Sequence, residues 1–181
     1  MPIESISTAR LQLRALLPEQ AMLMQHYLLS NRTHLAPWEP ARDADFFSLE
    51  KCEERLHANL RLMEAGLGRY FCVFLGEEVI GVCNFSNIVR GVFHACHLGY
   101  AIAEKHQGQG YMQEAVQGGI THMFTQQGLH RVMANYVPEN LRSAALLARL
   151  GFEKEGYARS YLKINGVWRD HVLTALVNPH D

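Results

Sequence analysis

Apolar and polar residues follow two different periods along this chain, and these divide it into segments of strand and helix character. Apolar runs, or alternation with a period of two, predict strands. The predicted strands cover residues 10–16, 70–75, 79–85, 92–103, 130–137, 156–164 and 167–177. Apolar residues that recur at spacings of three and four predict helices, which cover residues 19–29, 46–65, 112–124 and 141–150. Because no repeat or linker interrupts this order, it predicts one α/β (mixed α+β) domain over residues 1–181.

Turn-forming residues connect several of these segments. Gly76 and the Asn165-Gly166 pair each join two apolar runs, and both patterns are typical of β-hairpins. A further turn is predicted at residues 87–91. The stretch 31–40 contains two prolines and therefore predicts a loop. Its Trp38 either packs over the edge of the core or belongs to a substrate lid that also carries Glu39.

The most informative turn lies between the strand at 92–103 and the helix that follows it. It reads His106-Gln107-Gly108-Gln109-Gly110-Tyr111-Met112. A strand, a glycine turn and a helix leave unpaired backbone N–H groups at the helix N-terminus, where the helix dipole favours negative charge. The turn therefore predicts a site for a phosphate-bearing ligand. Two common phosphate loops are excluded, because the chain has no Gly-x-x-x-x-Gly-Lys-Ser/Thr and Gln113 replaces the third glycine of a dinucleotide fingerprint.

A second informative stretch covers residues 138–152. Asn140 precedes a helical pattern, Ser143 follows three residues later, and Gly151 stands where the pattern ends. Asparagine is a favoured residue at the start of a helix and glycine at its end. The stretch therefore predicts a short capped helix.

Composition and charge narrow the class of protein. The formal net charge is −1, with 48% hydrophobic and 19% charged residues, which is typical of a soluble globular protein without a general affinity for nucleic acid. The sequence begins without a signal-peptide pattern and has no stretch of membrane-spanning length, so we expect a cytoplasmic protein with no membrane partner. The four cysteines are scattered and predict buried, reduced thiols. We expect no metal, because strand alternation would place His94 and Cys96 on the opposite face from His97.

The two informative stretches together resemble the GNAT family of N-acetyltransferases. The pyrophosphate loop of that family has the motif Gln/Arg-x-x-Gly-x-Gly/Ala, whose fixed positions are filled here by Gln107, Gly110 and Met112, although Met112 is larger than the usual residue. Its second motif, Asn-x-x-Ser followed by Leu-Gly-Phe, is matched at residues 140–143 and 150–152. The resemblance covers nearly the whole chain. It implies the GNAT fold, a mixed central sheet of about seven strands that is splayed between the fourth and fifth strands and flanked by about four helices.

The same resemblance implies that acetyl-CoA is the co-substrate. In this family the pantetheine arm pairs with the first of the two splayed strands, the pyrophosphate lies on N–H groups of the loop, and the Asn-x-x-Ser residues face the thioester from the other side. The residues expected to bind acetyl-CoA are Ile102, Ala103, Gln107, Gly108, Gln109, Gly110, Tyr111, Met112, Asn140 and Ser143.

The catalytic candidates considered in the light of this resemblance are Ser143, Asn140 and Glu39. Many members of the family use a tyrosine of the last helix as proton donor to the leaving thiolate, but Leu147 occupies that position here. Ser143 is the candidate replacement, either as a direct hydrogen-bond donor to sulfur or by holding a water. The alternative is an ordinary serine of the first turn that only stabilises the helix. The base is left open among Glu39, Glu104, Tyr100 and Asp170, where Glu104 also fits a solvated turn and Asp170 a partner for a cation.

Within the family, the chain resembles the ribosomal-protein-alanine N-acetyltransferases. The stretches that carry this are residues 31–32, 37–40, 84–87, 89–91, 94–96 and 168–176. The implied acceptor is the N-terminal alanine of the fifth protein of the small ribosomal subunit, free or on assembling subunits, and the implied enzyme is a monomer or a dimer. Two alternatives stay open: an acetyltransferase for small-molecule amines or other protein N-termini, and a ribosome-assembly factor that retains an acetyl-CoA fold.

Overall fold

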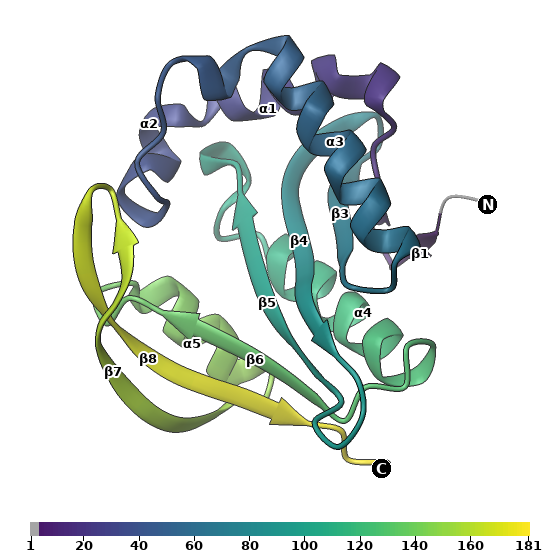
Figure 1. The fold of residues 1–181 in the computed structure, drawn as a ribbon, viewed down its shortest axis with the longest axis vertical. Helices are drawn as coiled ribbons and strands as arrows, with labels where there is room; N and C mark the ends of the chain where they lie inside the picture. The colour runs from purple at the N-terminus through teal and green to yellow at the C-terminus, as the bar shows by residue number, and fades with distance from the viewer. Residues whose placement is uncertain (1–3) are drawn as a thin grey trace.

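The computed structural model describes residues 4–181 and shows one twisted sheet with helices on both faces (Figure 1). The strands are β1 Ser5–Ser7, β2 Gln12–Arg14, β3 Arg69–Leu75, β4 Glu78–Val89, β5 Ala95–Ile102, β6 Arg131–Tyr136, β7 Glu153–Ile164 and β8 Val167–Val177. The α-helices are α1 Ala21–Ser30, α2 Arg32–Leu35, α3 Leu49–Glu64, α4 Tyr111–Thr125 and α5 Leu141–Arg149. Short 3-10 turns occupy Pro18–Gln20, Ala36–Trp38, Asp45–Phe47 and Glu104–His106.

The sheet is mixed, as predicted, and its strand order is β1-β2-β3-β4-β5-β6-β8-β7. Within the described residues, β5 and β6 are the one parallel pair of neighbours, and every other neighbouring pair is antiparallel. Within residues 4–181 this pair shares three register positions, the last being His97 opposite Met133. Beyond that point the two strands diverge. The predicted splay between the fourth and fifth predicted strands is therefore confirmed.

Three local predictions need correction. The sheet has eight strands because β1, whose three residues are too few for a period to be read, pairs with β2. The stretch 31–40, predicted as a loop, contains α2, which is held by Asn31 through a 2.8 Å bond from Nδ2 to the Tyr27 carbonyl. Strand β4 extends to Val89, into the predicted turn at 87–91, and the chain reverses over residues 90–94, where Gly91 and His94 have positive φ. In each case a tertiary contact outweighs the local pattern.

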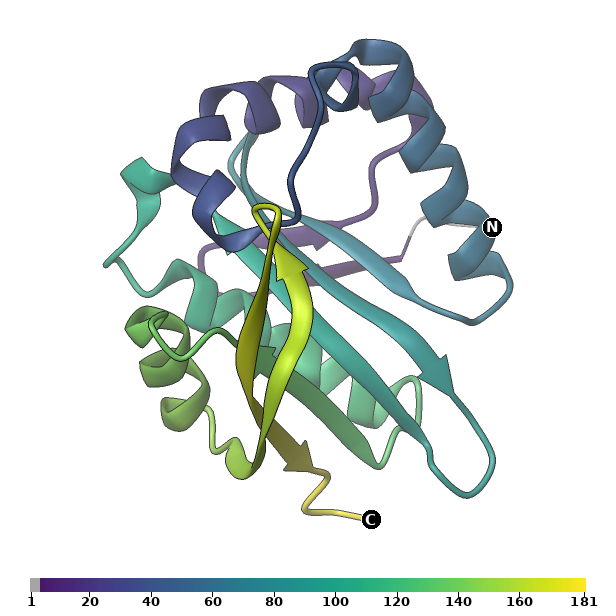
Figure 2. The ribbon, with the colours of Figure 1, turned by 60° about the vertical axis from the view of Figure 1, so that its left-hand side comes forward.

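Two apolar clusters lie on the two faces of the sheet. The first includes buried residues of α4 and α5, such as Val116, Ile120 and Leu147, and the second joins α1 and α3 to β3 through residues such as Tyr27 and Leu56. All four cysteines are buried and unpaired in the described part of the chain, in agreement with the prediction. Figure 2 shows how the β7–β8 hairpin rises from the sheet toward the segment after α2. The helices thus cover the sheet while leaving the divergence of β5 and β6 accessible.

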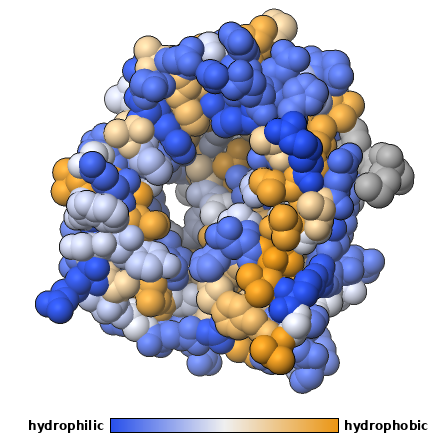
Figure 3. Space-filling view, in the orientation of Figure 1, coloured by the Kyte–Doolittle hydropathy of each residue, from blue (hydrophilic) through white to orange (hydrophobic). Residues whose placement is uncertain are grey.

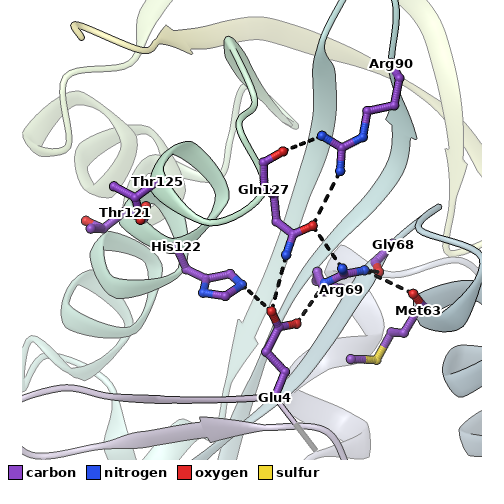
Figure 4. Close-up of polar contacts among 9 residues, drawn as sticks. All are labelled: Glu4, Met63, Gly68, Arg69, Arg90, Thr121, His122, Thr125 and Gln127. Atoms are coloured by element: carbon purple, nitrogen blue, oxygen red, sulfur yellow. Dashed lines mark hydrogen bonds and ion pairs between the residues drawn. The ribbon is translucent and has the colours of Figure 1, made fainter. Parts of the chain in front are cut away.

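A polar cluster connects the segment before β1 and the start of β3 to α4 and the turn that follows it (Figure 4). The carboxylate of Glu4 lies 2.8 Å from Arg69 Nε and, with its other oxygen, 2.8 Å from His122 Nε2. Gln127 accepts a 2.9 Å hydrogen bond from Arg69 Nη2, and Arg90 donates to the Gln127 carbonyl. The Arg69 and His122 side chains are only 15% and 12% exposed. Removal of Glu4 would therefore leave two largely buried groups without their ion-pair partner.

We expect Glu4→Ala to lower the free energy of unfolding by about 2 kcal/mol, because breaking a mostly buried ion pair leaves the remaining partner uncompensated. The measurement is equilibrium unfolding in urea. A matched control is Glu139→Ala, since Glu139 pairs with Arg169 at 2.9 Å but the two side chains are 64% and 34% exposed. That exposed pair should contribute less than about 1 kcal/mol. Equal losses in both variants would contradict the prediction.

Candidate functional site

The predicted phosphate loop has the backbone geometry of an anion site. Gly108 and Gly110 have φ of +73° and +78°, in the left-handed region that favours glycine. Gly110 is the N-cap of α4, and no side chain of residues 4–181 caps the helix there. The first N–H groups of α4 consequently point outward at the positive end of the helix dipole. The loop can therefore accept a pyrophosphate through backbone groups of Gln109, Gly110 and the residues that follow.

Met112 does not face this anion site. Its side chain is 6% exposed and belongs to the apolar cluster under α4. Its terminal methyl lies 3.1 Å from where a Cβ on Gly81 would stand, so the bare backbone of Gly81 makes room for it. The larger residue is thus accommodated inside the core, and only its N–H remains directed at the ligand side.

Arg10 is a member of the site that the sequence did not reveal. Its Nε donates to Glu114 Oε2 at 2.6 Å, and its Nη1 donates to the Gln109 carbonyl at 3.1 Å. The guanidinium also lies 4.5 Å from the centre of the Tyr111 ring. Arg10 thereby ties the β1–β2 turn to the loop and adds positive charge beside it. The contact cannot be predicted from local residue spacing, because Arg10 and Glu114 are 104 residues apart.

Two positions at the end of β5, Ile102 and Ala103, are predicted to bind acetyl-CoA, and only one of them has free backbone groups. Ala103 donates its N–H to the Ile80 carbonyl at 2.8 Å, so that group is already used within the sheet. Because peptide groups alternate along a strand, the N–H and C=O of Ile102 point to the other side, into the gap left by β6. Ile102 can therefore pair with an extended arm, whereas Ala103, only 2% exposed, supports the strand.

Asn140 and Ser143 lie at the start of α5, as the capping pattern predicts. Asn140 Oδ1 accepts the Ser143 N–H at 3.1 Å, and this is the N-cap bond of the helix. Ser143 Oγ lies 2.6 Å from the hydroxyl of Tyr100, which belongs to β5. Burial, partly opposed by the hydrogen bond with Ser143, raises the pKa of Tyr100 to about 12. Tyr100 is therefore a protonated donor at neutral pH, and we remove it from the candidate bases.

The other candidates occupy different surroundings. Asp170 accepts from Tyr157 Oη at 2.8 Å and from the Ser160 N–H at 2.7 Å, which lowers its pKa, so it holds an irregular turn of β7. Glu104 is exposed and begins the turn that precedes the loop. Glu39 lines a cavity of about 170 Å³ beside Arg32 and Arg42. Burial raises the pKa of Glu39, while Arg42 and Arg55 act in the opposite direction. The structure therefore brings Ser143 into contact with Asn140 and Tyr100. Glu39 makes neither of these contacts and lies beside Arg32 and Arg42 instead.

Residues 31–39 form an arch across the opening. At one end Asn31 Oδ1 accepts the Glu104 N–H at 3.1 Å and His34 Nε2 accepts from Gln107 Nε2 at 3.0 Å. At the other end the Glu39 carbonyl accepts the Asn165 N–H at 2.8 Å, at the tip of the β7–β8 hairpin. Figure 3 shows the surface hollowed beneath this arch, beside the end of β5. An acceptor can thus approach the splay from a side different from that of the phosphate loop.

Gln107 connects the arch to the second motif. Its Oε1 accepts a hydrogen bond from Arg142 Nη1 of α5, while its Nε2 donates to His34. The side chain at the first position of the loop motif is thus fixed from both sides. This places the loop, α5 and the arch in one connected polar arrangement around the splay.

A sheet opened between two parallel strands, with an uncapped helix N-terminus at the end of the first, is the arrangement expected of an acyltransferase that uses coenzyme A thioesters. The comparison with known families agrees with this class. The model of the acetyltransferase (GNAT) domain matches residues 10–153, and this chain belongs to the GNAT family. Within residues 4–181, no helix combines the length and apolarity that crossing a membrane requires.

Individual relatives are similar over nearly their full length. The chain is 49% identical to the [ribosomal protein uS5]-alanine N-acetyltransferase of Escherichia coli, with 99% of this chain and 93% of that protein covered. The crystal structure of ribosomal-protein-S5-alanine acetyltransferase from Vibrio fischeri has a TM-score of 0.92 at 43% identity, with 97% of both chains covered. Mycobacterium smegmatis RimJ, solved in complex with CoA-disulfide, has a TM-score of 0.91 at 28% identity, covering 98% of this chain and 88% of that one.

Proposed function

We propose that this protein transfers the acetyl group of acetyl-CoA to the N-terminal amine of alanine on ribosomal protein uS5. The observation that carries the proposal is the 49% identity, over 99% of this chain, to the Escherichia coli enzyme of that activity. The site is compatible with it, since the phosphate loop and the Asn140–Ser143 pair lie on two sides of the splay. The acceptor assignment rests on the relatives, because the phosphate loop by itself defines only the co-substrate.

The residues fit acetyl-CoA in three places. Backbone groups from Gln109, Gly110, Tyr111 and Met112 would hold the pyrophosphate, with Gln107 and Gly108 forming the start of the loop and Arg10 adding positive charge. The gap-facing groups of Ile102 would pair with the pantetheine arm as a neighbouring strand would. Asn140 and Ser143 would face the thioester from α5. The acetyl-CoA supplies an activated carbonyl, and the protein holds the amine against it.

The reaction then requires little covalent chemistry from the protein. The neutral amine attacks the thioester carbon, a carbon–nitrogen bond forms, and the carbon–sulfur bond breaks with its electron pair leaving on sulfur. A backbone N–H of the splayed part of β5, near Ile102, can stabilise the developing oxyanion. The proton lost from the amine must pass to a base, directly or through water.

Glu39 is our candidate for that base, and we expect Glu39→Gln to lower kcat/KM for an acceptor peptide about 100-fold. Burial raises the pKa of Glu39, so the wild-type rate should fall, as pH drops, at a higher pH than an exposed glutamate would give. The pH profile of kcat/KM measures both effects, and the variant should lose this acidic limb. Glu104→Gln is the matched control. Wild-type rates in Glu39→Gln with a loss in Glu104→Gln would transfer the role to Glu104.

Mass spectrometry of ribosomal proteins tests the acceptor most directly. Cells lacking this chain should lose one acetyl group from the N-terminus of uS5 and regain it when the wild-type chain is supplied. An unchanged uS5 mass would overturn the proposal. Purified enzyme should also prefer a peptide with the uS5 N-terminus over free amines, and the reverse preference would favour an acetyltransferase for small molecules.

We further propose that the acceptor is reached in the cytoplasm, either as free uS5 or on assembling small subunits. Acetylation of purified uS5 and of subunit precursors, compared at equal concentration, separates the two. Restoration of subunit assembly by a variant that cannot bind acetyl-CoA would instead favour the assembly-factor alternative. Sedimentation of the purified chain would decide between a monomer and a dimer.

A further inference from the structure

We infer that Tyr100 positions Ser143 to donate a hydrogen bond to the sulfur of coenzyme A as the thiolate leaves. This inference rests on the proposed use of acetyl-CoA. The two hydroxyls lie 2.6 Å apart and join β5 to α5 across the splay. The helix offers no tyrosine of its own at the usual position, because Leu147 is 1% exposed and packed in the core.

The direction of this hydrogen bond follows from the acidity of the two groups. A phenol is a stronger donor than an aliphatic hydroxyl, so the favoured arrangement has Tyr100 donating to Ser143 Oγ. The Ser143 hydroxyl hydrogen is then available to a third atom, and accepting a bond strengthens it as a donor. The N–H of Ser143 is already used by Asn140 Oδ1 at 3.1 Å, which fixes the backbone beneath the hydroxyl.

Acid strength decides between donating a hydrogen bond and donating the proton itself. A thiol has a pKa of about 8.5, so moving a proton to a thiolate from a phenol whose pKa burial raises to about 12 is unfavourable by roughly 3,000-fold. The hydroxyl pair therefore stays protonated and stabilises the thiolate by hydrogen bonding. The departing thiolate keeps its electron pair and takes a proton later from solvent, while the proton of the amine leaves through the base.

The test measures the thiol of bound, free coenzyme A rather than turnover alone. The ultraviolet absorbance of its thiolate is followed in a pH titration with the wild type, Tyr100→Phe, Ser143→Ala and Ser143→Thr. A hydrogen bond to a charged group should lower the pKa of the bound thiol by about one to two pH units relative to coenzyme A in water. Ser143→Ala should remove this shift, Ser143→Thr should keep most of it, and Tyr100→Phe should reduce it by about half.

Turnover provides the second readout. We expect Tyr100→Phe and Ser143→Ala to lower kcat while the KM for acetyl-CoA stays near the wild-type value. The double variant should be no slower than Ser143→Ala, because Tyr100 acts through Ser143. Tyr70→Phe is the matched control, since it removes another partly buried tyrosine hydroxyl on β3. Urea unfolding of each variant identifies any loss that comes from instability.

Three results would overturn the inference: an unshifted thiol pKa in the wild type, a wild-type thiol pKa in Tyr100→Phe, or additive losses of kcat in the double variant. Failure of the wild-type protein to bind coenzyme A in calorimetry is a different outcome. It would refute the proposed function itself, and it is detected before any variant is compared.

Discussion

Gly110→Asp should abolish measurable binding of acetyl-CoA. The substitution places a carboxylate at the N-cap of α4, where the pyrophosphate is expected to rest. Two like charges about 4 Å apart near a protein surface repel by about 4 kcal/mol, which corresponds to a loss of affinity of about 1,000-fold. Titration calorimetry measures the dissociation constant directly. Unaltered affinity would show that this loop is not a phosphate site.

Two further variants separate charge from backbone strain in this experiment. Gly110→Ala imposes a side chain at a φ of +78° without adding charge, and its Cβ would lie 3.5 Å from Arg10 Nη2. Gly76→Asp adds the same carboxylate at a φ of +59° in the β3–β4 turn, where no described atom lies within 4 Å of the new Cβ. We expect a moderate loss of affinity for the first variant and none for the second.

Gly81→Ala should strongly destabilise the fold, although it adds only one methyl group. The new Cβ would stand 2.5 Å from the backbone oxygen of Ala101 and 3.1 Å from the Met112 methyl. A backbone atom cannot rotate away, so β4 and β5 must separate at the C-terminal end of β5, where Gly81 lies opposite Ile102. Overpacking of this kind costs about 3 kcal/mol, and we expect that loss in the free energy of unfolding measured in urea. The affinity for acetyl-CoA should fall as well, because Met112 is pushed toward the loop.

Gly99 supplies the control on the adjacent strand. A Cβ there would meet no described atom within 4 Å, so Gly99→Ala should change the free energy of unfolding by less than about 0.5 kcal/mol. Comparable losses in the two variants would show that the close contact at Gly81 relaxes without cost. The comparison isolates packing, because both glycines lie in strands and neither has a positive φ.

Long elements with a regular period could be predicted from the sequence, and short elements held by distant contacts could not. Helix α4 and the hairpin at Asn165-Gly166 carry their own local signals, an apolar face and a turn that requires positive φ. Strand β1 has three residues and exists because β2 pairs with it. Helix α2 has four and depends on Asn31, whose side chain bonds both to Tyr27 and to Glu104. The local pattern of apolar and polar residues does not predict those contacts.

The same distinction applies to the site. The phosphate loop and the Asn140 cap are contiguous in sequence, so motif and spacing are sufficient to predict their geometry. Arg10 could not be found in this way, and the bond between Tyr100 and Ser143 joins residues 43 positions apart. The sequence places Tyr100 among the possible bases because it is a polar group near a plausible edge of the substrate site. Its acidity depends on burial, which only the folded arrangement determines.

The arch over the splay has a consequence for the order in which the protein becomes complete during synthesis. Its last contact joins Glu39 to Asn165, which are 126 residues apart in the chain. The phosphate loop and α4 are contained in the first 125 residues, so the part of the site expected to hold the pyrophosphate can take shape while the hairpin is still being made. The opening for the acceptor gains its final wall only when the last strands have left the ribosome.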